Sequence, residues 1–243
     1  MKPIRLALAA LLALAAPQAA SAVFHFAVID EVMTSYGGDP AVQFVEIRME
    51  TAGQGQVGNS VLARFDADGN YQGDVLIVPG DVANAGTGAR WIMGTTAFET
   101  AAGIQVDFEF APGLFTGGGM VCWGAPGLSP PAPTWDRTQF TNYVDCVAYG
   151  AYSGPTNVRI GTPTPLAPDG HSLVRVDETH DNETDFACGD PATPTNNDGD
   201  SVELAPTIPC PEPAAPLLLA TGALALLTRG RARRRRPARA ERA

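Results

Sequence analysis

The sequence predicts an all-β fold, an antiparallel β-sandwich with long loops. Apolar and polar residues alternate in short runs, Gly, Pro, Asn and Asp separate these runs, and helical periodicity is almost absent. The clearest alternation extends from Ile104 to Phe110, where every second residue is apolar. A strand with this pattern buries one face and exposes the other to water, as strands of an antiparallel sheet do.

Further runs of the same kind supply the remaining strands of the predicted sandwich. Val45, Ile47 and Met49 form an apolar stripe, and Glu46 and Arg48 between them are expected to face solvent. Short strands separated by turn-forming residues are typical of a sandwich. The other expected strands occupy residues 24–32, 61–65, 75–78, 91–93, 120–123, 144–149 and 172–176.

One tight turn and two longer loops separate these runs. Residues 66–70 lie between two strand-like runs, and Gly69 and Asn70 accept the positive φ that a tight turn needs, which predicts a hairpin. Residues 124–136 are rich in Pro and predict a long surface loop. Residues 177–200 are polar and acidic, which is typical of either a disordered stalk or a loop ordered by a metal ion.

Calcium is the one cofactor that the sequence suggests. Asp66, Asp68, Asn70 and Asp74 place side-chain oxygen atoms at alternate positions around a Gly, as calcium-binding loops do. The spacing departs from that of an EF-hand, because the Gly comes early and Ile77 occupies the twelfth position. A hairpin turn without metal explains the same residues. A second, less regular group consists of Asp181, Asp185, Asp190, Asp198 and Asp200.

The four cysteines predict disulfides, because an even number of cysteines in an exported chain suggests that they are paired. Three pairings are possible. Cys122 and Cys146 each lie within an apolar, strand-like run, which favours pairing them. Cys188 and Cys210 would then close the polar C-terminal segment.

The N-terminus has the layout of a secretory signal peptide over residues 1–22. Lys2 and Arg5 supply positive charge, residues 6–16 are apolar, and residues 20–22 form a small-residue cleavage site. We therefore expect export, with the mature chain beginning near Val23.

The C-terminus has the features of a second targeting signal. Residues 214–228 are apolar, and as a helix they would reach about 22 Å, less than a bilayer core of about 30 Å. Basic residues beside such a helix hold their end on the cytoplasmic side. The segment is therefore expected to pause the exported chain transiently in the inner membrane.

The Pro211-Glu212-Pro213 triplet, this apolar helix and the Arg cluster after it resemble the PEP-CTERM sorting signal, over residues 211–236. Cys210 also resembles the cysteine of the related Myxo-type signals, and an ordinary tail anchor is the alternative. The resemblance implies an exosortase-type sorting protease as partner and delivery to the cell surface of a Gram-negative-type envelope. It would leave residues 195–210 as a polar linker and 237–243 as a cytoplasmic remnant. The basic residues of the signal are Arg229, Arg231, Arg233, Arg234, Arg235 and Arg236.

Residues 23–194 resemble the lamin-tail domain in its bacterial extracellular form. The resemblance implies an immunoglobulin-like sandwich and a role in adhesion or assembly, without chemistry of its own. Asp30 replaces the usual Asn of that family and Phe44 stands where a Trp is common. The matching segments are Val28-Ile29-Asp30-Glu31-Val32, Gln43-Phe44-Val45-Glu46-Ile47, Asp145-Cys146-Val147-Ala148-Tyr149-Gly150, Gly170-His171-Ser172-Leu173-Val174-Arg175, Asp185-Phe186 and Pro194.

The charge of the expected exported part argues against nucleic-acid binding. Residues 23–210 contain six basic and 24 acidic side chains, so their net charge is near −18. Such a surface repels phosphate backbones. Cations are natural partners of an acidic exported surface, although solubility alone explains the charge equally well.

No catalytic constellation is identifiable in the sequence, and we nominate no catalytic residue. Gly170-His171-Ser172 begins like a nucleophile elbow, but the second Gly is missing and the pattern is that of a strand. The leading expectation is a non-catalytic, surface-anchored domain for adhesion, binding or assembly, with a protein or polysaccharide of the envelope or matrix as its partner. The alternatives are a secreted hydrolase with a carboxylate pair and a purely structural matrix component.

Overall fold

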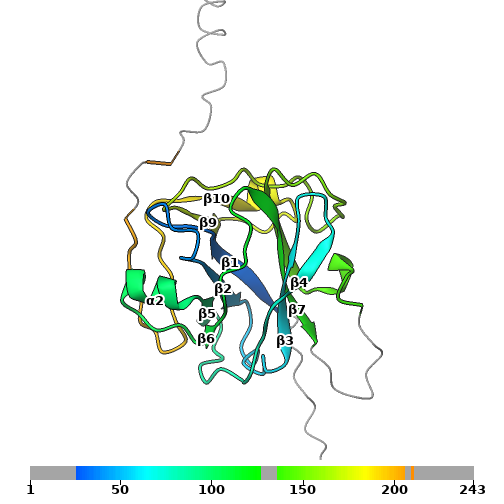
Figure 1. Cartoon of the computed structure of the whole chain (residues 1–243). Helices are drawn as coiled ribbons and strands as arrows, with labels where there is room; N and C mark the ends of the chain where they lie inside the picture. Colours follow the sequence, from blue (N-terminus) through cyan, green and yellow to red (C-terminus); the bar gives the residue numbers. More distant parts are fainter. Residues whose placement is uncertain (1–25, 127–135, 206–208, 211–243) are drawn as a thin grey trace, which may run out of the picture. The chain divides into compact units, whose positions relative to one another are not determined.

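The computed structural model of the chain describes residues 26–126, 136–205 and 209–210. They contain ten strands in two sheets (Figure 1). The six-stranded sheet has the order β10-β9-β1-β2-β5-β6, and the four-stranded sheet has the order β4-β3-β7-β8. The first sheet is formed by β1 (Ala27–Met33), β2 (Phe44–Met49), β5 (Arg90–Gly94), β6 (Phe108–Glu109), β9 (Ser172–Arg175) and β10 (Phe186–Gly189). The second is formed by β3 (Ser60–Phe65), β4 (Tyr71–Ile77), β7 (Gly118–Pro126) and β8 (Asp145–Gly150).

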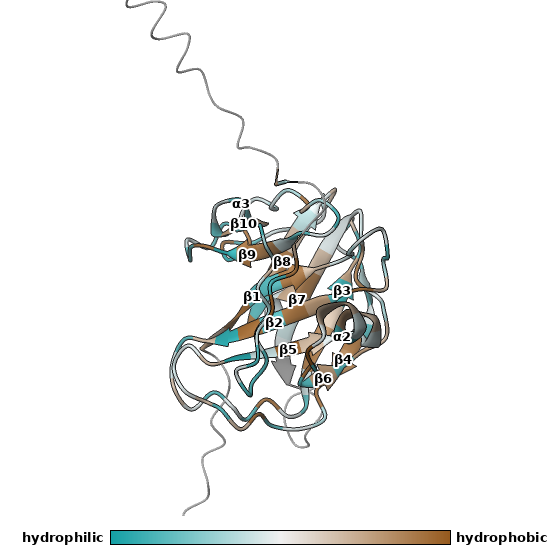
Figure 2. Cartoon of the chain, turned by 90° about the vertical axis from the view of Figure 1, so that its left-hand side faces the viewer, coloured by the Kyte–Doolittle hydropathy of each residue, from teal (hydrophilic) through white to brown (hydrophobic). Residues whose placement is uncertain are grey.

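The main core lies between the two sheets, as the sandwich prediction requires. Ile29, Ile47 and Trp91 lie side by side on β1, β2 and β5 and are fully buried. Trp91 meets Trp123 of β7 edge to face, with ring centroids 5.6 Å apart. Many residues of the strands that contribute to this core are apolar and appear brown in Figure 2. The architecture is therefore sandwich-like and mostly antiparallel.

The strand predicted over residues 104–110 is mostly wrong. Only Phe108 and Glu109 form a strand, β6, which pairs in parallel with β5. Just before β6, side-chain acceptors take the place of some of the backbone hydrogen bonds that join neighbouring strands. The Val106 amide donates to Glu99 Oε1, and Asp107 Oδ2 accepts from the Ile92 amide at 2.7 Å. Alternation alone did not distinguish a strand from a chain held by side-chain hydrogen bonds.

Helices are few, but the sequence analysis did not anticipate them. Helix α2 (Thr96–Ala102) begins after Thr95, whose side chain accepts from the Phe98 amide, and ends at Gly103 with φ 72°. These are ordinary helix start and stop signals on a segment of seven residues, too short for a periodic pattern. Helix α3 (Asn182–Asp185) and the 3₁₀ helix η1 (Phe140–Asn142) are shorter still.

Residues 190–205, which we call the strap, cover part of the outer face of the six-stranded sheet. The strap passes α2 in Figure 1, and its two arms are bridged between Ala192 and Leu204. The Thr193 amide donates to Glu31 Oε1, and the Thr195 amide donates to Glu46 Oε2. Glu46, which the sequence placed at the solvent face, is therefore only 1% exposed.

The strap also changes the expected domain boundary. Residues 195–210 were expected to be a polar linker, but the compact unit of the chain extends to Cys210. Asn197 Nδ2 donates to the carbonyls of Asn84 and Arg90, and Asn197 Oδ1 accepts from the Asn84 amide. The polar side chains of this segment therefore supply hydrogen bonds to the rest of the domain.

Both disulfides that the sequence favours are formed. Cys122 and Cys146 are paired neighbours on β7 and β8, and their bond lies in a second apolar cluster. Cys188 of β10 is bonded to Cys210, a few residues beyond the strap. The hairpin predicted at residues 66–70 is also confirmed, since it joins β3 to β4.

Several expectations fall outside the described residues. They are the signal peptide, much of the Pro-rich loop and the sorting signal with its apolar helix at 214–228. Among the helices of the described residues, none is long and apolar enough to cross a membrane.

Candidate functional site: an arginine-lined cleft

A β-bulge in β1 begins the site. The pairing of β1 with β2 shifts between Ile29 and Glu31, which leaves Asp30 as the extra residue. Arg48 of β2 and Arg90 of β5 are cross-strand partners on the outer face, opposite the core. Arg48 Nε donates to Asp30 Oδ1 at 2.6 Å, and Arg90 Nε donates to Asp30 Oδ2 at 2.9 Å. The carboxylate of Asp30, the bulge residue, thus orients the guanidinium groups of Arg48 and Arg90.

The partial separation of β1 from β9 forms the adjoining part of the site. The two strands pair only at Glu31–Val174 and Val32–Leu173. Beyond these pairs, the Ile29 amide donates to Asp145 Oδ2 and the Ile29 carbonyl accepts from Arg175 Nε, each at 2.8 Å. Side chains therefore satisfy the backbone of β1 where β9 leaves it.

An open, polar cleft lies over this region, with two adjoining hollows of about 450 Å³ and about 270 Å³. They share Arg175 and Glu178, and we call them together the arginine cleft. The first hollow is also lined by Asp30, Arg48, Arg90, Val176 and Asp177, and the second by Ala27, Val28, Glu50, Val144, Asp145, Arg159, His180 and Asp185.

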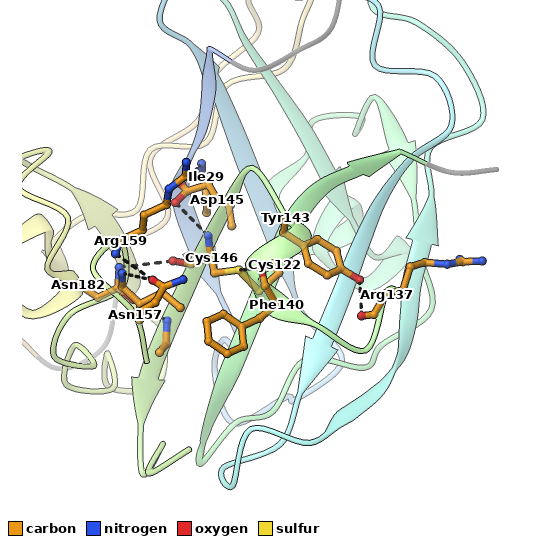
Figure 3. The surroundings of a disulfide bond; sticks show 12 residues. Ile29, Cys122, Arg137, Phe140, Tyr143, Asp145, Cys146, Asn157, Arg159 and Asn182 are labelled. Carbon is orange, nitrogen blue, oxygen red and sulfur yellow. Dashed lines mark hydrogen bonds between the residues drawn. A yellow bond between two sulfur atoms is a disulfide. The ribbon is translucent and has the colours of Figure 1, made fainter. Parts of the chain in front are cut away.

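The cleft concentrates the positive charge of an acidic protein. Residues 23–210 contain six basic side chains, all arginine, and four of them line the cleft. Arg64 and Arg137 lie outside the cleft. Arg64 donates to the Gly113 carbonyl, and Arg137 forms an ion pair with Asp74. Arg159 extends toward Asp145 in Figure 3. Its guanidinium makes no hydrogen bond or ion pair within the described part of the chain.

Some N–H donors of the cleft arginines have no acceptor among the described residues. Arg48 uses Nε and Nη2, and Arg90 uses the same two atoms, so that Nη1 of each has no acceptor among the described residues. Two carboxylates of the cleft already accept hydrogen bonds from groups of the protein itself. Both oxygens of Asp30 accept from arginine, and Asp185 accepts from the amides of Thr179, His180 and Asp181. This pattern fits an anionic group on a ligand.

Glu50 and Glu178 form a carboxyl pair at the rim of the cleft. The hydrogen bond with Glu178, together with partial burial, raises the pKa of Glu50 to about 7. The same hydrogen bond, with one from Arg48, lowers the pKa of Glu178. Arg48 Nη2 lies 2.9 Å from Glu178 Oε1. Just below about pH 7 the pair therefore shares one proton.

One exposed apolar side chain lines the cleft, and two others are sequence neighbours of lining residues. Val176 lines it and is 62% exposed, and Val158, which precedes Arg159, is 90% exposed. Phe26 is 57% exposed, and its carbonyl accepts from the Glu50 amide. Among the described residues, only Ile77 adds to this set of exposed large apolar side chains. Apolar groups beside unpaired donors are typical of a binding surface.

The residues proposed for calcium are placed differently from a metal site. Asp66 Oδ1 accepts from the amides of Asp68 and Asn70 at 3.1 and 2.8 Å, which holds the hairpin turn. Asp74 accepts from the Tyr71 hydroxyl and forms an ion pair with Arg137. The hairpin explanation accounts for the contacts of Asp66, whereas Asp74 is paired with Arg137 from outside the hairpin.

The second acidic group does not converge either. Asp185 is buried and caps its own loop, whereas Asp190, Asp198 and Asp200 are exposed. Within the described ranges, three potential ligand atoms of His, Cys, Asp or Glu approach one another to 4.8 Å at one place only, formed by His171, Cys188 and Cys210. The two cysteines are disulfide-bonded there.

The sequence analysis did not identify the arginine cleft. Its arginines come from four separate segments, and cross-strand register and the divergence of β9 bring them together. The scarcity of basic residues in residues 23–210 was the available signal. In the segment that resembles a nucleophile elbow, the Ser172 hydroxyl donates to Glu31, which makes it part of the sheet.

Comparisons with known proteins give no relative for this chain. No protein-family model matches it, and neither the curated proteins nor the solved structures contain a significant match.

Proposed function

We propose that this chain is an exported, non-catalytic domain that binds a component of the cell envelope or extracellular matrix through the arginine cleft. The observation that carries the proposal is the concentration of four of six arginines in one open cleft, with donor atoms left over and apolar side chains beside it. The partner is a protein or polysaccharide with anionic groups, because the cleft offers more free donors than free acceptors.

The route to the cell surface is part of the same proposal. A signal peptide at residues 1–22 would export the chain, and the PEP-CTERM-like segment at 211–236 would be processed by an exosortase-type protease. The two disulfides support an oxidising compartment. The sandwich-like architecture is compatible with a lamin-tail-like, immunoglobulin-like domain.

Binding to isolated envelope and matrix material tests this function. We expect the full chain to cosediment with that material and Arg159→Gln to weaken cosedimentation about tenfold, since it removes one charged donor. Arg159 is exposed and its side chain makes no hydrogen bond or ion pair with the described residues, so its replacement should leave the fold intact. Arg137→Gln is the matched control, because it removes the same charge outside the cleft.

Two results would contradict the proposal. If the wild-type chain does not cosediment at physiological salt, it is not a binding domain for the envelope or matrix. If both arginine variants weaken binding equally, the interaction follows net charge and the cleft is not the site.

A hydrolase is the second candidate, because Glu50 and Glu178 have pKa values moved apart in one cleft, as an acid and a base require. Glu50→Gln and Glu178→Gln would then each abolish release of reducing sugar or peptide from the same matrix material. Under the binding proposal, no release occurs with the wild-type chain at any pH between 5 and 8.

A further inference from the structure

The two disulfides lie in different surroundings. Cys122 and Cys146 are 0% and 6% exposed, inside an apolar cluster. Cys188 and Cys210 are both partly exposed, at the edge of the six-stranded sheet. A thiol from solvent therefore has access to the second bond and little access to the first.

A buried histidine contacts the accessible disulfide. His171 Nδ1 lies 2.9 Å from the Gly189 carbonyl oxygen and 3.3 Å from Cys210 Sγ. Neither a carbonyl oxygen nor a disulfide sulfur can donate a hydrogen bond, so Nδ1 carries the proton and points at both acceptors. Sulfur in a disulfide is a weak acceptor, whereas a thiolate is a charged and much stronger one.

We propose that Cys188–Cys210 is a site of thiol–disulfide exchange with an external thiol or dithiol, and that His171 assists it. The incoming thiolate attacks Cys188 Sγ, and the Cys188–Cys210 bond breaks with its electron pair going to Cys210. His171 Nδ1–H stabilises the Cys210 thiolate, which makes it the better leaving group. A mixed disulfide forms at Cys188.

A dithiol completes the exchange. Its second thiol displaces Cys188, so that the dithiol becomes a disulfide and its two protons end on the two cysteines. Reduction removes the covalent link between β10 and the end of the compact unit, where the chain passes into Pro211. The exchange therefore controls how firmly this end of the domain is held.

Differential alkylation tests the selectivity. The oxidised full chain is treated with dithiothreitol at pH 8 without denaturant, alkylated with iodoacetamide and mapped by mass spectrometry. We expect Cys188 and Cys210 to be alkylated while Cys122 and Cys146 stay bonded. With glutathione, the adduct should form on Cys188 and the free thiol should be Cys210. Equal reduction of both disulfides, or an adduct on Cys210, would overturn the proposal.

The role of His171 is tested with two variants. His171→Asn keeps an N–H donor near the Nδ1 position, and His171→Leu removes it. We expect His171→Leu to slow reduction at least about fivefold, because a charge-assisted hydrogen bond to the leaving thiolate is lost, and His171→Asn to restore most of the rate. Equal rates in the two variants, at equal resistance to urea, would show that His171 has only a packing role.

Discussion

At the scale of single residues, the most unusual groups are two buried glutamates under the strap. Glu31 and Glu46 are partners across β1 and β2. Burial raises the pKa of Glu31 to about 7, and burial together with repulsion from Glu31 raises the pKa of Glu46 to about 9. Arg90 lies 3.0 Å from Glu46 but is shared with Asp30 and is 40% exposed, so it does not offset burial.

These shifts predict how stability depends on pH. Because the folded-state pKa values lie above 4.5, the folded chain holds protons that the unfolded chain releases, and stability decreases as pH rises from about 4.5 toward the folded-state values. Between pH 5 and pH 8 we expect the free energy of unfolding to decrease by on the order of 2–4 kcal/mol, measured by urea denaturation.

The variant Glu46→Gln tests the assignment. It stays neutral at every pH, so it should remove much of that decrease, whereas the exposed control Glu203→Gln should behave as the wild type does. Identical pH profiles for Glu46→Gln and the wild type would mean that Glu46 is ionised in the folded protein.

At the scale of elements, polar side chains organise both the hairpin and the strap. Much of the sheet could be predicted from alternation, as in β2 and β3, and the disulfides followed from cysteines placed in strand-like runs. The strap could not, because its Asn and Asp residues read as linker composition until their backbone partners are known. The strand predicted over residues 104–110 was mostly wrong for a similar reason, because side-chain hydrogen bonds hold part of that run.

The strap predicts a clear cost for one substitution. Asn197→Ala removes three hydrogen bonds that the buried Asn197 side chain makes with the backbone of Asn84 and Arg90, so we expect a loss of about 2–3 kcal/mol in urea denaturation. Asp198→Ala, at the exposed neighbouring position, should change stability little. Similar effects of the two substitutions would show that the strap is only loosely attached.

The hairpin between β3 and β4 gives the calcium test. We expect millimolar calcium, added and then chelated, to leave the melting temperature unchanged, because Asp66 is engaged by the turn and Asp74 by Arg137. Asp66→Ala should lower the melting temperature by a few degrees with or without calcium, by loss of the turn's hydrogen bonds. A chelator-reversible rise in the wild type that Asp66→Ala abolishes would instead establish a calcium loop.

At the scale of the whole molecule, charge and architecture act together. Residues 23–210 have a net charge near −18, yet the sheet register helps to gather four of their six arginines at one cleft. At physiological salt, charges farther apart than about 8 Å are largely screened. A partner that reaches the cleft therefore interacts mainly with the charges that line it, which are the four guanidinium groups and the carboxylates beside them.

Arginine footprinting tests the central claim most directly. The full chain is treated with a dicarbonyl reagent, with and without envelope and matrix material, and the modification of its arginines is mapped by mass spectrometry. We expect protection of Arg159 and Arg90, the more exposed arginines of the cleft, and unchanged modification of Arg64 and Arg137. Protection confined to Arg64 or Arg137, or equal protection of all six arginines of residues 23–210, would contradict binding through the arginine cleft.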